Sequence, residues 1–108
     1  MKRVRISAAR WQTPADAHRA LAAGLDFPAH YGNNLDALHD CLTDLTDTEL
    51  IVEQCALAEE RMPEKWRGFL AVFLDAAEEN PGLRVKLVLG DADYIENTSN
   101  RKGRHDGL

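Results

Sequence analysis

The sequence predicts an α/β fold: a small three-stranded parallel sheet packed with helices. Three short apolar segments, over residues 4–8, 50–52 and 85–89, have the alternation or the compactness of strands. Longer stretches with apolar residues at helical spacing separate them, and strands separated by helices pair in parallel through crossovers. The chain has 108 residues, of which 44% are hydrophobic and 29% charged, so it is expected to form one globular core.

The first strand and the first helix are predicted from local pattern and from capping residues. Val4 and Ile6 alternate with arginines, as in a half-buried strand. The segment 13–16 then offers a capping Thr, a Pro at the first helical position and an acid in the first turn. This helix is predicted to end at Gly24, in the role of a C-terminal cap.

A second helix is expected after a loop that runs through residues 27–33. Asn33 or Asn34 can cap it, and its apolar spacing continues to residue 43 or 45. It is the helix that carries most of the functional signal.

The rest of the predicted fold alternates strand, helix and strand. Leu50-Ile51-Val52 is a candidate buried strand. A third helix is expected to begin at Pro63 and to run to about Glu79, where Asn80-Pro81-Gly82 stops it. Because residues 91–108 are polar, we predict a domain over residues 1–90 and a loose C-terminal tail over 91–108.

Composition excludes several classes of function. The formal net charge is −5, which argues against binding to nucleic acid or to an anionic membrane surface. No apolar run is long enough to span a membrane, and the basic N-terminus lacks the apolar stretch of a signal peptide. Cys41 and Cys55 could form one bridge, but two reduced thiols in a cytoplasmic protein are the favoured interpretation.

The sequence also lacks the motifs of common active sites. It has no Gly-x-Ser-x-Gly, no glycine-rich phosphate loop, no zinc-type Cys pair and no His-Glu-x-x-His. His39 lies among aspartates, but one His and two carboxylates on a helix make a weak metal site. We therefore expect no enzyme activity, no cofactor and no bound metal.

The charges are segregated along the chain. Residues 1–19 hold five basic residues and one acid, whereas residues 20–60 hold nine acids and neither Lys nor Arg. A solvated acidic face is the usual explanation of such a stretch. A surface that meets a basic partner is the alternative, and the helix in its middle bears on the choice.

That helix carries two opposite faces. At about 100° per residue, Asp36, Asp40 and Asp44 fall within about 80° of one another, and the leucines lie on the other side. Like charges four residues apart destabilise a helix by about 0.2–0.5 kcal/mol per pair. The aspartates therefore have a cost without a local benefit, which favours a partner with clustered Arg or Lys side chains.

The motifs around this helix resemble those of the barstar family. The string runs from Phe27-Pro28 through Tyr31-Gly32-Asn33-Asn34-Leu35-Asp36-Ala37-Leu38 to Asp40-Cys41-Leu42-Thr43. A weaker match covers residues 72–79 and the last strand. The resemblance implies a three-stranded parallel sheet with helices. It also implies one-to-one blockage of a barnase-type ribonuclease, with Asp40 in the place of a substrate phosphate and Asp36 supporting it.

The sequence departs from the family pattern at several contact positions. His30, His39 and Leu45 stand where the family has aromatic contacts, Asp44 replaces a glycine, and Asp75 is a shortened acid. The partner-binding residues that we predict are His30, Tyr31, Gly32, Asn34, Leu35, Asp36, His39, Asp40, Thr43, Asp44, Val72, Asp75 and Glu79. Tyr31 could equally be a core aromatic. A barstar-fold interaction module with a basic partner that is not a nuclease is the alternative function.

Overall fold

The computed structural model describes residues 1–90 with their side chains and residues 94–97 as backbone. Its elements follow the order β1, α1, α2, β2, α3, α4, β3, β4. The strands are β1 (Lys2–Ser7), β2 (Thr48–Glu53), β3 (Leu83–Val88) and β4 (Tyr94–Asn97). The helices are α1 (Pro14–Leu25), α2 (Leu35–Thr43), α3 (Cys55–Arg61) and α4 (Pro63–Glu79). Among the described residues, no helix is long and apolar enough to cross a membrane.

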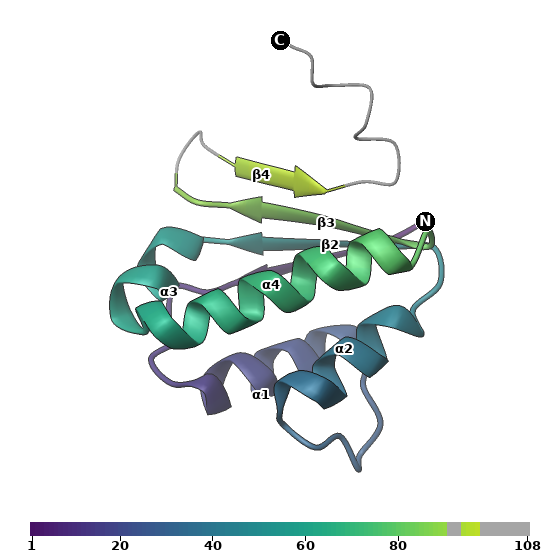
Figure 1. The fold of residues 1–108 in the computed structure, drawn as a ribbon, viewed down its shortest axis with the longest axis horizontal. Coiled ribbons are helices and arrows are strands. Elements are labelled where there is room, and N and C mark those ends of the chain that lie inside the picture. Colours follow the sequence, from purple (N-terminus) through teal and green to yellow (C-terminus); the bar gives the residue numbers. More distant parts are fainter. Residues whose placement is uncertain (91–93, 98–108) are drawn as a thin grey trace, which may run out of the picture.

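One sheet carries all four strands in the order β1-β2-β3-β4. The pairs β1–β2 and β2–β3 are parallel, so the predicted three-stranded parallel sheet is confirmed. In register, Val4 lies beside Leu50 and Leu50 beside Val85, and these three side chains are buried. Figure 1 shows α4 running across the sheet, with α1 and α2 beside it on the same side. The helices therefore cover one face of the sheet, and no helix of the described residues covers the other face.

The start of α1 is as predicted, but its end is not. Thr13 and Asp16 form a reciprocal capping box, with Pro14 in the first turn. The helix ends at Leu25 and not at Gly24, and Asp26 caps it in a left-handed conformation (φ 60°). Gly24 lies inside the helix, where a Cβ would come within 2.7 Å of the Ile6 side chain. Its role is to let α1 approach β1.

The α4 helix supplies the largest part of the core. Trp66, Phe69 and Phe73 are buried at the predicted helical spacing. Trp11, from the segment before α1, is also buried, and its ring centroid lies 6.4 Å from that of Phe69. These aromatic side chains help to pack α4 against the sheet beside α1, and α2 packs on α4 in turn.

Two elements were not predicted. Helix α3 has only seven residues and follows Gln54, which takes a left-handed conformation in place of a side-chain cap. Strand β4 falls inside the predicted tail and pairs antiparallel with β3 through backbone hydrogen bonds, which polar sequence does not prevent. The prediction of a loose tail is thus wrong for residues 94–97. Residues 91–93 and 98–108 lie outside the described residues. The division at residue 90 stays a prediction.

Candidate partner-binding surface

Helix α2 is anchored by leucines and displays carboxylates on its opposite side. Leu38 and Leu42 are fully buried, whereas Asp36, Asp40 and Asp44 are exposed. The predicted separation of the two faces is confirmed. Asn34 caps the helix, since its side-chain oxygen accepts a hydrogen bond of 2.8 Å from the Ala37 amide; the other predicted candidate, Asn33, precedes it.

Helix α2 ends before the acidic pattern does. Thr43 is its last residue, and Asp44 serves as the C-terminal cap. Asp47 follows in a turn with φ 49°, and its carbonyl accepts a hydrogen bond of 2.8 Å from the Lys2 amide. Only three aspartates therefore share the exposed helical face.

Helix α4 supports α2 along a seam of small and polar contacts. A Cβ at Gly68 would lie 2.7 Å from Leu35 Cδ1, so the absence of a side chain there lets Leu35 pack against α4. At the other end of the seam, Asn80 Nδ2 donates to the carbonyls of Leu42 (3.0 Å) and Leu45 (2.8 Å). These bonds satisfy carbonyls at the end of α2 and hold it in place.

The seam also brings carboxylates of the two helices together. His39 Nε2 lies 3.2 Å from Glu79 Oε2 on α4, and His39 Nδ1 lies 3.9 Å from Asp40 Oδ1. We call the exposed carboxylates of α2 and of the adjacent side of α4 the acidic surface. Its members are Asp36, Asp40, Asp44 and Asp75, together with Glu79, whose side chain is 58% exposed.

The acidic surface has no Lys or Arg counter-charge in the part of the chain that the structure describes. Among the described residues, no Lys or Arg forms an ion pair with any of its five carboxylates. The pKa of the Cys41 thiol is raised by partial burial, and the negative charges of Asp44 and Asp40 raise it further. Cys41 is half-buried, and both cysteines are free, as the sequence favoured.

The loop before α2 is held by side chains at both of its ends. Asn34 Nδ2 donates to the Gly32 carbonyl at 3.2 Å, while the neighbouring His30 is exposed. Tyr31 is half-buried, with its ring centroid 4.9 Å from that of Phe27 and its hydroxyl 2.7 Å from His18 Nδ1. The hydroxyl of Tyr31 therefore holds the loop against α1, and part of the Tyr31 ring stays accessible.

His18 is a buried polar residue of this region, and only 3% of it is exposed. It shares the buried side of α1 with Leu21 and Leu25, a spacing of three and four residues that could have revealed it.

The remaining predicted residues lie on or beside the seam. Thr43 is half-buried and its hydroxyl donates to the Asp40 carbonyl at 3.0 Å, so it stabilises the last turn of α2. Val72 is half-buried against the core, and Asp75 is exposed. Among the described residues, no group of His, Cys, Asp and Glu side chains has an arrangement that could hold a metal ion.

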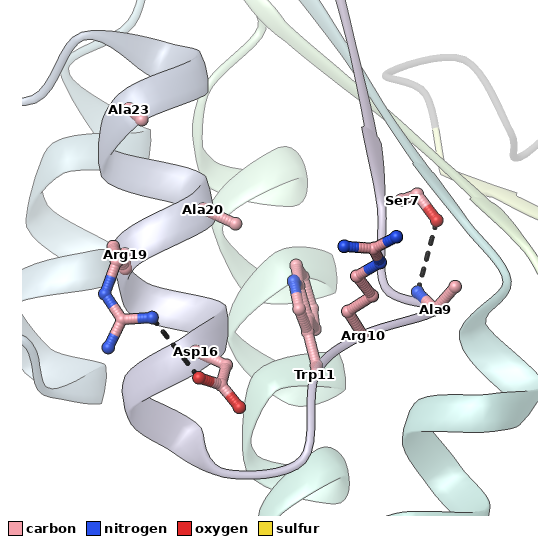
Figure 2. A pocket seen from close by; sticks show the side chains of 8 residues that line it. All are labelled: Ser7, Ala9, Arg10, Trp11, Asp16, Arg19, Ala20 and Ala23. Carbon is pink, nitrogen blue, oxygen red and sulfur yellow. Dashed lines mark hydrogen bonds and ion pairs between the residues drawn. The ribbon is translucent and has the colours of Figure 1, made fainter.

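A separate hollow of about 440 Å³ lies where β1 leads into α1. Figure 2 shows Arg10 and Arg19 on either side of the Trp11 ring, with Arg19 paired to Asp16 at 3.3 Å. None of the predicted partner-binding residues lines this hollow. Its positive side chains distinguish it from the acidic surface.

Comparison with known proteins identifies the family of this chain. The family model described as Barstar (barnase inhibitor) matches residues 1–90. A Bacillus subtilis (strain 168) protein named "Putative ribonuclease inhibitor YrdF" is 42% identical over 50 residues, which cover 46% of this chain and 55% of that relative. The chain thus spans about half the length of the curated relative that it matches. Because the family model covers most of the sequence, the chain belongs to the barstar family.

Proposed function

We propose that this chain binds and inhibits a small basic ribonuclease of the barnase type, one molecule to one. The observation that carries the proposal is the acidic surface, whose carboxylates are exposed and have no Lys or Arg partner in the described part of the chain. Family membership supports the same class of target. A ribonuclease active site must bind phosphate, and so it offers the cationic side chains that this surface lacks.

In this proposal, Asp40 takes the place of a substrate phosphate. It lies in the middle of the exposed helical face, and its side chain is 84% exposed, so a partner can reach both of its oxygens. Asp36 and Glu79 flank it from the same helix and from α4. The seam holds these groups in a fixed geometry, which lowers the entropic cost of binding.

The other predicted contacts surround this centre. The loop over residues 30–34 would close the contact on one side, and Asp44 and Asp75 would extend the negative potential on the other. Opposite charges accelerate association, so binding should slow as salt screens them.

The direct test is inhibition. The chain, prepared alone, is titrated against a panel of barnase-type ribonucleases in an RNA-cleavage assay, with binding followed by calorimetry. We expect stoichiometric inhibition of at least one enzyme and slower association at higher salt. Failure to bind any member of the panel at micromolar concentration would contradict the proposal for those targets.

A pull-down separates the proposed function from the alternative. Capture of a basic protein without nuclease activity, lost in an Asp40→Asn variant, would support a barstar-fold interaction module. Capture of a ribonuclease with the same dependence on Asp40 would support inhibition.

A further inference from the structure

A hollow of about 300 Å³ lies where the first turns of α1, α2 and α4 meet. Leu35 and Phe69 give it apolar walls, and Asn34 lies at its border with the loop before α2. Asn34 and Leu35 are also predicted partner contacts, so the hollow adjoins the acidic surface. Its volume is at the lower end of the range of pockets that enclose a ligand.

Among the side chains that line the hollow, His18 is the buried one with a ring nitrogen whose hydrogen-bonding capacity is unused in the described part of the chain. His18 is only 3% exposed. Its Nδ1 is occupied by the Tyr31 hydroxyl at 2.7 Å, but Nε2 has no partner in the described part of the chain. No fully enclosed side-chain nitrogen or oxygen there lacks a partner. Nε2 is therefore accessible, and the hollow is the route to it.

The charges at the hollow favour a neutral occupant. Burial lowers the pKa of His18 below its ordinary value of 6.5, so the imidazole is uncharged at neutral pH. Glu64 and Lys65 both lie at the rim, and their opposite charges cancel. A carboxylate or an ammonium group would find no unbalanced counter-charge here, in contrast to the acidic surface.

A phenol is the group that best matches apolar walls, a neutral site and one free ring nitrogen. Its ring can pack against Phe69 and Leu35, and its hydroxyl can donate to Nε2 or accept from it, whichever tautomer the Tyr31 bond selects. Indole can only donate, and a phenyl ring would leave Nε2 without a partner. Tyrosine is also among the residues that most often anchor protein interfaces.

We infer that this hollow receives a tyrosine side chain of the inhibited ribonuclease, with its hydroxyl on His18 Nε2. The inference rests on the proposed function, and it adds a neutral anchor beside the charged contacts. His18 thereby becomes a specificity-determining residue, although it lies beneath the surface that the aspartates form.

The test uses p-cresol, which reproduces the tyrosine side chain, and toluene, which lacks only the hydroxyl. Each is titrated into the ¹⁵N-labelled full chain, and NMR follows the His18 ring nitrogens and the amides of Leu35 and Gly68. We expect p-cresol to shift Nε2 and to bind about fivefold more tightly than toluene, the effect of one ordinary hydrogen bond. Burial of apolar area alone would favour toluene. Equal or weaker binding of p-cresol, or shifts away from these residues, would overturn the inference.

A His18→Phe variant provides the control, because it keeps a ring and removes both nitrogens. It should abolish the preference for p-cresol; if it does not fold, the comparison on the unmodified chain still decides. Neither probe involves a ribonuclease, so the outcome is independent of the inhibition assay. In a complex with an inhibited enzyme, Nε2 should shift as it does with p-cresol, and an unchanged Nε2 would exclude the anchor.

Discussion

The acidic surface and the face of the sheet that lies away from the helices differ in how the structure pairs their charges. On the sheet, Arg3 pairs with Glu49 at 2.7 Å and Arg5 with Glu53 at 3.5 Å, across neighbouring strands. On the acidic surface, His39 is the only basic side chain of the described residues that approaches the carboxylates. Both surfaces are built from short, regular elements. On the sheet, these two carboxylates have arginine partners, whereas the carboxylates on α2 have no Lys or Arg partner among the residues that the structure describes.

This contrast distinguishes charges that stabilise the fold from charges that we propose to bind a partner. Cross-strand pairs of opposite charge contribute modestly to a sheet, while like charges four residues apart in a helix oppose folding. The surplus of five negative charges is therefore not a general property of the surface. The part that we propose to bind a partner lies on α2 and α4, where the described residues provide no Lys or Arg partner.

The largest expected effect is on the scaffold beneath the acidic surface. Leu42→Ala should lower the free energy of unfolding by about 2–5 kcal/mol, because it leaves a cavity under α2. Asp44→Ala, on the opposite side of the same helix, should change it by less than about 0.5 kcal/mol. Urea denaturation followed by circular dichroism measures both. Similar losses for the two variants would show that the faces are not divided as described.

The second largest effect on stability is expected at the seam between α2 and α4. Asn80→Ala removes the donor to the Leu42 and Leu45 carbonyls and should cost about 1–3 kcal/mol of unfolding free energy. Hydrogen exchange should also accelerate in the last turn of α2 and not in β1. A variant as stable as the parent chain would mean that water replaces Asn80 without loss.

Much of this arrangement could be predicted from the sequence because it depends on local signals. The helical spacing of apolar residues predicts α2 and α4, and caps such as Thr13 and Asn34 predict where helices begin. The exposed position of the three aspartates follows from the same periodicity. Each of these features depends on residues within about one helical turn of one another.

The rest depends on contacts between distant segments. Asn80 reaches α2 across 35 to 38 residues, and Gly68 makes room for Leu35 on another helix. The burial of His18 depends on Tyr31 and Phe69 as well as on its own helix. A single sequence carries no local signal for such pairs, which is why the seam and the hollow emerge only from the structure.

Neutralising single carboxylates should affect stability in opposite directions on the two surfaces. Asp40→Asn removes two like-charge pairs and should raise the unfolding free energy by about 0.2–0.5 kcal/mol for each. Glu53→Gln removes the partner of Arg5 and should lower it by up to about 1 kcal/mol. Both differences should shrink in high salt. Changes of the same sign would remove the distinction between the surfaces.

The smallest effect expected is on the Cys41 thiol. Because Asp44 and Asp40 raise its pKa, Asp44→Asn should lower that pKa and speed alkylation by iodoacetamide at a fixed pH near 8. Burial raises the pKa of Cys55 to about 12, so Cys55 should stay unreactive in the folded chain. Glu53→Gln, on the sheet, is the matched control and should leave the rate unchanged. An unaltered rate in the Asp44 variant would mean that solvent screens the field at α2.

The affinities of Asp40→Asn and Glu53→Gln for one inhibited ribonuclease test the central claim most directly. Calorimetry on both variants compares an unpaired carboxylate with a paired one, each replaced by its own amide. Removing one partner of a buried charge pair costs about 2–5 kcal/mol of binding free energy. The barnase–barstar complex, from this same family, is one of the systems behind that general figure. We therefore predict at least about a 30-fold loss for Asp40→Asn and less than about a twofold loss for Glu53→Gln. Equal losses, or a larger loss for Glu53→Gln, would contradict the assignment of the acidic surface as the binding site.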